Sequence, residues 1–284
     1  MIGYNFLASP GQLGNQMFKY AALRGFAENN NQDFLIPPSY LKFEKYSLAY
    51  KIATKYLIPR NKQNHFLFDC FEMTSVQKKN IGYLETEHQI KEKSFHFDEN
   101  IFNCKLSDFD ISGFFQTEKY FKNVEDIIRS DFKFKEFINT KANKIISKFD
   151  SPVSIHIRRD DYVTNPNHHA LNLNYYKESI SLFKNEDIFI IFSDDAEWCK
   201  QQKLFSDKKF IFASDFTGSF NYLDMCLMSK CDKHIIANST FSWWGAWLSN
   251  QKNIIAPKYW FKNTNLKELN TSDLLPEGWV QIEN

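Results

Sequence analysis

The sequence predicts an α/β fold built on parallel β-sheets, and two observations carry that prediction. From residue 153 onward, short apolar segments rich in β-branched residues alternate with segments whose apolar residues repeat at helical spacing. At the start of the chain, residues 2–8 resemble a strand that leads through a glycine-containing turn into an amphipathic helix. Short apolar strands that alternate with helices are typical of parallel sheets covered by helices on both faces.

The second half of the chain shows this alternation most regularly, with a helical segment between most pairs of strands. The predicted strands are residues 153–157, 188–192, 210–213, 235–237 and 254–256, and the predicted helices are residues 173–184, 196–204, 219–230 and 240–248. Because each strand is a nearly continuous apolar run, we expect the sheet to be buried on both faces.

The first half of the chain is less regular. A turn with two glycines at residues 9–16 precedes a helix that a run of three asparagines ends. Its further predicted elements are strands at residues 34–36, 81–84 and 110–115, a partly helical stretch at 41–57, and two helical pieces within 118–149. The sequence changes character at Asp150-Ser151-Pro152, so we predict two domains, residues 1–150 and residues 151–284.

Composition and charge narrow the classes of function. The 284 residues are 43% hydrophobic and 24% charged, which is enough for a packed core. The formal net charge of +1 gives no electrostatic support for binding nucleic acid. Five scattered cysteines without a C-x-x-C pair favour neither zinc nor a disulfide framework and indicate a reducing compartment. With no signal peptide and no apolar run of about 20 residues, we expect a cytoplasmic protein without stable membrane insertion.

Polar residues follow four predicted strands of the second half, at the edge where a parallel sheet binds its ligands. They are Arg158, Arg159, Asp160 and Asp161 after the first strand, Asp194 and Asp195 after the second, Ser214 and Asp215 after the third, and Asn238, Ser239 and Thr240 after the fourth. A guanidinium is permanently charged and forks onto phosphate oxygens, so Arg158 or Arg159 is suited to a diphosphate. A carboxylate can accept both N–H groups of a guanine edge, a role open to Asp194 or Asp195. Since side chains alternate along a strand, His156 and Arg158 should share a face that Arg159 need not share.

The stretch from His234 to Asn250 combines a strand-like start with a buried helix. Between the two lie Asn238, Ser239 and Thr240, residue types that cap the N-terminus of a helix. A helix start presents free N–H groups and the positive end of the helix dipole, so this stretch is suited to a phosphate. The alternative interpretation is an ordinary cap on a buried helix.

The remaining candidates also have purely structural interpretations. Arg158 and Arg159 could form a structural ion-pair cluster with Asp160 and Asp161. His156 could be a histidine of the core, and His168 and His169 could be solvated loop residues. Asp108-Phe109-Asp110 is a D-x-D pattern, which in some sugar-transferring enzymes holds a divalent cation. Here Asp110 enters a predicted strand rather than following one, so we interpret the pattern as a chance occurrence and predict no metal.

Several motifs resemble those of a known enzyme family. Residues 156–162, HIRRDDY, resemble the H-x-R-R-x-D signature shared by α-1,2-, α-1,6- and protein O-fucosyltransferases. Residues 238–248, NSTFSWWGAWL, and residues 11–18, GQLGNQMF, are similar to the α-1,2-fucosyltransferase branch, which residues 113–121 match more loosely. Asp160 stands where many relatives have glycine, and the segment between Tyr162 and Tyr175 varies in the family. The acceptor is therefore the feature that the resemblance determines least.

The resemblance implies a GT-B-like fold, in which two Rossmann-like domains face each other across a cleft. Residues 1–150 would form the acceptor-side domain and residues 151–284 the GDP-fucose-binding domain. The implied donor is GDP-fucose and the implied acceptor is a galactose-terminated glycan, with inversion at the fucose carbon and no metal requirement. By this likeness the donor-binding residues are Gly14, Asn15, Gln16, His156, Arg158, Asp194, Asp195, Asn238, Ser239, Thr240 and Phe241, and the catalytic residues are Arg158, Arg159, Asp160 and Asp161.

These residues suggest a mechanism in which the acceptor hydroxyl attacks the fucose carbon from the face opposite GDP. Arg158 or Arg159 and the helix start at Ser239 would stabilise the leaving diphosphate. Asp160 and Asp161 are the nearest carboxylates for a general base, although Asp161 could instead orient the arginines. Two other functions stay open, namely an enzyme of this fold with another nucleotide sugar and a non-catalytic sugar- or nucleotide-binding module. An NAD-dependent oxidoreductase would need a glycine fingerprint that the chain lacks.

Overall fold

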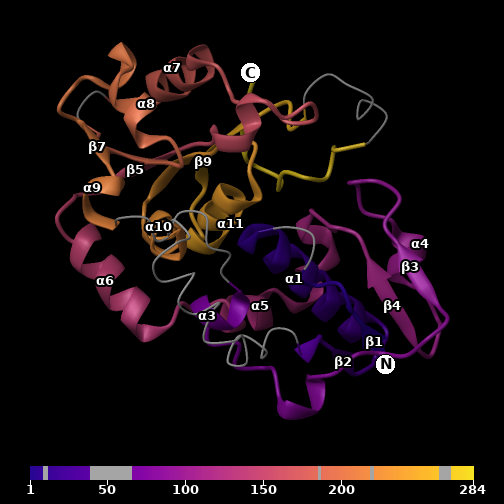
Figure 1. The fold of residues 1–284 in the computed structure, drawn as a ribbon. Coiled ribbons are helices and arrows are strands. Elements are labelled where there is room, and N and C mark those ends of the chain that lie inside the picture. The colour runs from indigo at the N-terminus through magenta and orange to yellow at the C-terminus, as the bar shows by residue number, and fades with distance from the viewer. Residues whose placement is uncertain (9–11, 39–65, 185–186, 218–220, 262–269) are drawn as a thin grey trace. The chain divides into compact units, whose positions relative to one another are not determined.

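The computed structural model describes residues 1–8, 12–38, 66–184, 187–217, 221–261 and 270–284. The chain forms two compact units. The N-terminal unit comprises Met1–Lys135 and Leu269–Pro276, and the C-terminal unit comprises Glu136–Glu268 and Glu277–Asn284. Each unit is built on one parallel sheet with helices packed on it (Figure 1), so the predicted α/β class is confirmed. The helical stretch predicted at 41–57 and residues 9–11 of the glycine turn lie outside the described residues.

The division into units differs from the boundary predicted at residue 150. Helix α6 (Glu136–Ile146) belongs to the C-terminal unit, where it packs against α10 (Asn221–Met228) and brings the rings of Phe137 and Tyr222 to 6.4 Å. Since α6 buries one face on α10, the chain enters the C-terminal unit before it reaches the first strand of that unit.

The N-terminal unit contains a four-stranded parallel sheet in the order β2-β1-β4-β3. Helix α1 (Leu13–Asn29) is buried along most of its length, and a Cβ at its Gly25 would overlap the backbone oxygen of Tyr120. Within the described residues of this unit, the strands are β1 (Ile2–Gly3), β2 (Phe34–Leu35), β3 (Gln89–Lys91) and β4 (Phe109–Ser112), and the other helices are α3 (Leu67–Cys70), η4 (Lys78–Asn80), α4 (Glu99–Phe102), η5 (Glu118–Tyr120), η6 (Lys122–Val124) and α5 (Glu125–Asp131).

The strands of this unit differ from the predicted ones in several places. The first strand ends at Gly3, and residues 5–8 form a turn in which the side chain of Asn5 exchanges hydrogen bonds of 2.9 and 3.0 Å with the backbone of Leu84. Strand β4 ends at Ser112 rather than at residue 115. Residues 81–84 form no strand but only an isolated bridge between Ile81 and Ile36. Strand β3 was missed because it is an edge strand with exposed Gln89 and Lys91, so it carries little apolar signal.

The C-terminal unit contains a six-stranded parallel sheet in the order β10-β9-β8-β5-β6-β7. The chain starts in the middle with β5, runs outward to β7, returns to β8 beside β5, and runs outward again to β10. This is the strand order of a Rossmann fold, and its direction reverses between β5 and β8. The strands are β5 (Val153–Ile157), β6 (Phe189–Ser193), β7 (Phe210–Phe212), β8 (Lys233–Ile235), β9 (Asn253–Pro257) and β10 (Val280–Ile282).

The two faces of strand β5 differ in chemistry. Val153, Ile155 and Ile157 pack in the apolar core with residues of α7 (Leu173–Ser181) and α8 (Ala196–Lys200). Ser154 and His156 alternate with them and point to the other face, where Ser154 Oγ lies 2.8 Å from His234 Nδ1. Helix α11 (Thr240–Ser249) covers that face, because its Ser242 contacts His156.

The predicted elements of this unit largely agree with the structure. Strand β5 has the predicted bounds, whereas β8 begins and ends two residues earlier than predicted. His234 lies within β8, and its Nε2 contacts Ser249 of α11. The edge strand β10, which has exposed Val280 and Gln281, was not predicted. The remaining helices in the part of this unit that the structure describes are η7 (Asp160–Val163), η8 (Lys203–Phe205) and α9 (Ser214–Thr217). Among the described residues, no helix has the length and apolar character needed to cross a bilayer.

Candidate functional site

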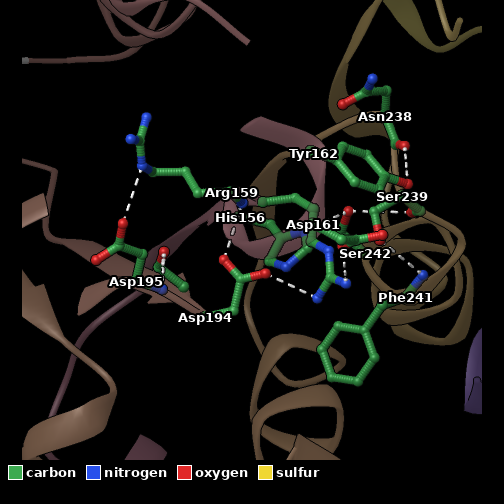
Figure 2. Close-up of polar contacts among 12 residues, drawn as sticks. His156, Arg159, Asp161, Tyr162, Asp194, Asp195, Asn238, Ser239, Phe241 and Ser242 are labelled. Carbon is green, nitrogen blue, oxygen red and sulfur yellow. Dashed lines mark hydrogen bonds and ion pairs between the residues drawn. The ribbon is translucent and has the colours of Figure 1, made fainter. Parts of the chain in front are cut away.

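The candidate site lies at the switch point of the C-terminal sheet, where β5 and β8 are neighbouring strands. Figure 2 shows the polar contacts among its residues. Adjacent parallel strands whose connections leave in opposite directions form a crevice at their carboxyl ends, and ligands bind there. Arg158 directly follows β5, and Asn238 and Ser239 connect β8 to α11. The sheet therefore brings together residues that are 80 positions apart in the chain.

Two carboxylates hold the guanidinium of Arg158. Its Nη2 donates to Asp161 Oδ1 at 2.6 Å, and its Nη1 lies 2.7 Å from Asp194 Oδ2. The guanidinium also lies 5.3 Å from the ring centre of Tyr162. The side chain of Arg158 is 18% exposed, whereas that of Asp161 is 55% exposed. The bond to the exposed partner is the one that an incoming anion can replace at little cost.

Arg159 points to a different part of the unit. Its guanidinium lies over the ring of Trp198 of α8, 3.6 Å from the ring centre, and its Nε donates to Asp195 Oδ2 at 3.1 Å. His156, by contrast, faces α11. The alternation predicted for β5, in which Arg159 need not share the face of His156, is therefore confirmed. The two arginines have different neighbours and can have different roles.

Asp194 and Asp195 both use their two carboxylate oxygens within the protein. Asp194 Oδ1 accepts the backbone N–H of Arg159 at 2.9 Å, while its Oδ2 faces Arg158. Asp195 Oδ1 caps α8 by accepting the N–H of Trp198 at 3.2 Å, while its Oδ2 binds Arg159. Burial raises the pKa of Asp194, and the charge of Arg158 opposes that rise. Reading of a guanine edge by either carboxylate stays a prediction.

His156 is an uncharged histidine in this environment. Its Nδ1 lies 2.9 Å from Ser242 Oγ, and its ring centre lies 5.7 Å from that of Phe241. Burial, followed by the neighbouring charge of Arg158, lowers the pKa of His156 to about 3. A neutral imidazole next to Arg158 adds no positive charge to the site, so it can serve there only as a hydrogen-bonding group.

Hydrogen bonds of Ser239 and Asn238, in the loop before α11, fix the start of this helix. Ser239 is the N-cap, and its Oγ accepts the N–H of Phe241 at 3.4 Å. Asn238 is fully buried, and its Nδ2 donates to the backbone oxygens of His169 at 3.1 Å and Trp260 at 3.0 Å. Asn238 thus holds the surrounding loops in place, and the helix start with Ser239 and Thr240 is positioned beside the end of β5.

Four residues without a predicted role take part in this arrangement. Tyr162 donates from its hydroxyl to the backbone oxygen of Asn238 at 3.2 Å, and His168 stacks on its ring at 4.7 Å with an angle of 12°. Tyr162 and Ser242 lie within the motifs of the sequence, so their contribution could have been suspected. Trp198 and His168 carry no local signal, because only the folded chain brings them to Arg159 and Tyr162. His168 is packed and half-buried rather than a solvated surface residue, so that interpretation was wrong.

Of the other predicted residues, Asp160 adjoins this cluster, because it is exposed in η7 and its backbone N–H donates to Asp194. The rest lie apart from the cluster. Asp215 pairs with Lys200 at 3.0 Å. Asp108 pairs with the N-terminal amine at 2.9 Å, while Asp110 is part of β4 and accepts the N–H of Asn5 at 2.8 Å. Within the described ranges, no three His, Cys, Asp or Glu residues are grouped so that they could hold a metal ion.

The three remaining predicted donor-binding residues belong to the N-terminal unit. Gly14, Asn15 and Gln16 form the first turn of α1, at the carboxyl edge of that sheet. Asn15 Oδ1 accepts a hydrogen bond of 3.1 Å from Gln116 Nε2, and Gln16 is buried. Their contact with a sugar stays a prediction.

The fold defines the class of protein, an α/β protein with two parallel sheets, one of which has the strand order of a Rossmann fold. Residues 2–283 match the sequence profile of the family described as glycosyl transferase family 11, and the chain belongs to that family. This confirms the resemblance to α-1,2-fucosyltransferases that the motifs indicated.

Similar proteins include bacterial and mammalian enzymes. The chain is 35% identical to an alpha-1,2-colitosyltransferase of Escherichia coli, with 96% of this chain and 97% of that protein covered. It is 29% identical to the O-antigen biosynthesis glycosyltransferase WbnK of Escherichia coli, over 96% and 98% of the two chains. It is 25% identical to the galactoside alpha-(1,2)-fucosyltransferase 1 of Bos taurus, over 96% of this chain and 74% of that one.

A solved structure with the same fold is that of NodZ alpha-1,6-fucosyltransferase soaked with GDP-fucose. The TM-score is 0.50 at 11% sequence identity, over 86% of this chain and 90% of that chain. At so low an identity the likeness bears on the fold alone, and it supports the predicted GT-B-like class with two parallel sheets. That the two domains face each other across a cleft stays a prediction.

Proposed function

We propose that the protein transfers L-fucose from GDP-fucose to the 2-hydroxyl of a terminal galactose, with inversion and without a metal ion. One observation carries the proposal, namely the placement of Arg158 and the capped start of α11 at the switch point of the C-terminal sheet. Membership of glycosyl transferase family 11 supports the reaction class, and the mammalian relative named galactoside alpha-(1,2)-fucosyltransferase supports the linkage.

The donor diphosphate would bind between Arg158 and the N-terminus of α11. A guanidinium can bind two phosphate oxygens at once, and the free N–H groups at the start of a helix favour negative charge. Arg158 would exchange its bond to the exposed Asp161 for a phosphate oxygen, while the bond to Asp194 keeps the guanidinium in place. The charge that develops on the leaving GDP is thereby stabilised in the transition state.

The other charged residues would act around that step. Asp161 contacts Arg158 in the structure, which supports a role in orienting the arginine until the donor binds over a role as general base. Asp160 is also exposed and takes no part in that ion pair, so it is the better candidate for a base. Arg159 would support the site by holding Asp195 and Trp198 rather than by binding phosphate.

A second donor is favoured by one comparison. The relative at 35% identity is named an alpha-1,2-colitosyltransferase, so GDP-colitose is the alternative donor for this chain. The relative named O-antigen biosynthesis glycosyltransferase supports a role in surface glycan synthesis, for which the nucleotide-sugar donor would be met in the cytoplasm.

The proposal is tested by incubating the purified protein with each of four donors, GDP-fucose, GDP-colitose, GDP-mannose and UDP-galactose. The acceptors are lactose and N-acetyllactosamine, and the linkage of the product is determined by NMR. We expect transfer from GDP-fucose to the 2-hydroxyl of galactose. Preferred transfer from GDP-colitose would replace the donor, and binding of GDP without transfer or release would identify a non-catalytic module.

A further inference from the structure

Glu92 in the N-terminal unit holds a turn of the backbone through its side chain. It directly follows β3, and its two carboxylate oxygens accept the N–H groups of Phe114 at 2.6 Å and Phe115 at 2.9 Å. These two residues belong to the segment that follows β4. A carboxylate that accepts two successive backbone N–H groups fixes the peptide planes between them, because charge-assisted hydrogen bonds are short and strong.

The backbone of this turn is shaped for that contact. Gly113 has φ +156°, and a Cβ at this position would overlap Glu92. Phe115 has φ +51°, the left-handed conformation that a non-glycine residue adopts at an energetic cost. The hydroxyl of Tyr4 donates to the backbone oxygen of Gly113. The turn is therefore held in a strained conformation by side chains from β3 and from the end of β1.

A buried lysine lies close to the same turn. Lys19 of α1 is 1% exposed, and its Nζ lies 5.3 Å from the ring centre of Phe114 and 5.9 Å from that of Tyr4. Burial lowers the pKa of Lys19 to about 8, and the charge of Glu92 opposes that shift. Charges are seldom buried in a protein without a function or a partner. Glu92 and Lys19 are close enough for the charge of each to affect the pKa of the other.

The turn leads to a pair of amide side chains. Gln116 follows Phe115 and is 6% exposed, and its Nε2 donates to Asn15 Oδ1 at 3.1 Å. The Oε1 of Gln116 has no hydrogen-bond partner among the described residues. Since Gln116 is the next residue after the two that Glu92 holds, the direction of its amide depends on the conformation of the turn.

We propose that Glu92 is a positioning residue of the transfer reaction. Through the backbone of Phe114 and Phe115 it sets the amide of Gln116, which in turn orients Asn15 toward the sugar. The inference rests on the proposed function in one respect, the contact between Asn15 and a sugar. Glutamate is needed at this position because it offers two acceptors, whereas a glutamine would set its NH₂ group against one of the two N–H groups.

The first test compares Glu92→Gln with Glu87→Gln, a control at an exposed glutamate of the same segment. Hydrogen exchange of the amides of residues 113–117 should become faster in Glu92→Gln and stay unchanged in Glu87→Gln. Loss of one charge-assisted hydrogen bond that positions the site should lower kcat/KM roughly tenfold. If Glu92→Gln fails to fold, Glu92→Asp, whose carboxylate is one methylene shorter, should speed the same exchange. Unchanged exchange in the folded variants would overturn the proposal.

The second test asks whether Glu92 acts through Gln116. In Gln116→Met, which removes the amide at similar volume, the further change Glu92→Gln should lower kcat/KM no more, because the coupled residue is already gone. Additive losses in kcat/KM would mean that Glu92 supports the fold alone, and would overturn the proposal. If the wild-type protein prefers a donor other than GDP-fucose, the kinetics are measured with that donor. The hydrogen-exchange rates of residues 113–117 do not depend on which donor is used. The two hypotheses can therefore fail separately.

Discussion

The carboxyl edges of the two sheets hold their charged groups in different ways. At the edge of the C-terminal sheet, Arg158 is held by the carboxylates of Asp161 and Asp194. At the edge of the N-terminal sheet, Glu92 is held by two backbone N–H groups. A guanidinium with an exposed partner can exchange that partner for a ligand anion. A carboxylate bound to the backbone instead determines the shape of the chain around it. The arrangement around Arg158 therefore suits the binding of a charged group, and the arrangement around Glu92 suits the positioning of neutral side chains.

The largest expected effect separates the two arginines of the C-terminal edge. Arg158→Ala should lower kcat about 10²–10³-fold, the usual loss when a group that stabilises transition-state charge is removed. Arg159→Ala should lower kcat by about tenfold or less, because Arg159 holds Asp195 and Trp198 rather than the diphosphate. Steady-state kinetics with a saturating acceptor measure both. Equal losses in kcat would contradict the division of roles, and melting temperatures show whether either variant has lost its fold.

A stability effect is expected from the buried contact beneath the site. Ser242→Ala leaves Nδ1 of the buried His156 without its partner and should cost about 1–3 kcal/mol in the free energy of unfolding. The matched control is Ser249→Ala, which removes the contact of a half-buried serine with His234 Nε2. We expect a smaller loss there, since water can reach the vacated position. Urea unfolding of both variants measures the two losses in the free energy of unfolding. A greater loss in Ser249→Ala than in Ser242→Ala would contradict the prediction.

The pH dependence of stability should have opposite signs at the two edges. His156 and His234, with pKa values lowered by burial to about 3, bind protons more readily when unfolded, so their contribution to stability is lost as the pH falls from 6.5 toward 3. Glu92, with its pKa raised by burial to about 7, binds a proton more readily when folded. Its contribution is present below pH 4.5 and is lost as the pH rises through 7.

Unfolding in urea between pH 4.5 and 7 tests the sign of the pH dependence of stability that we expect from Glu92. The difference in unfolding free energy between the wild-type protein and Glu92→Gln should shrink as the pH rises, because only the wild type loses the bound proton. A difference that stays constant or grows over this range would mean that Glu92 is already ionised at pH 4.5. The pH dependence of stability would then no longer have opposite signs at the two edges.

The smallest expected effect concerns Tyr162. Tyr162→Phe removes the hydrogen bond to the backbone oxygen of Asn238 but keeps the ring that faces Arg158 and His168. We expect a loss of about 0.5–1.5 kcal/mol in the free energy of unfolding and nearly unchanged kcat. Tyr162→Ala, which also removes the ring, should lower kcat further. A large fall of kcat in Tyr162→Phe would show that the hydroxyl, rather than the ring, acts in the reaction.

Much of the C-terminal unit could be predicted because its signals are local. Strand β5 is a continuous apolar run, and the alternation of its side chains predicted that Arg159 need not share the face of His156. The N-terminal unit was harder to predict. Strand β3 has exposed residues on both sides of Ile90, and β1 is followed at once by a turn whose Asn5 contacts the distant Leu84. Neither feature leaves a pattern in the sequence around it.

By itself the sequence determined the fold class, the family motifs and the polar ends of the strands, since hydrophobic periodicity and helix capping are properties of neighbouring residues. Only the tertiary structure decided which partner each charged group has. Arg159 meets Trp198, and Glu92 meets the backbone of Phe114, because strand order and packing bring separate segments together. Such pairings depend on distances between elements, and a linear pattern carries no information on those distances.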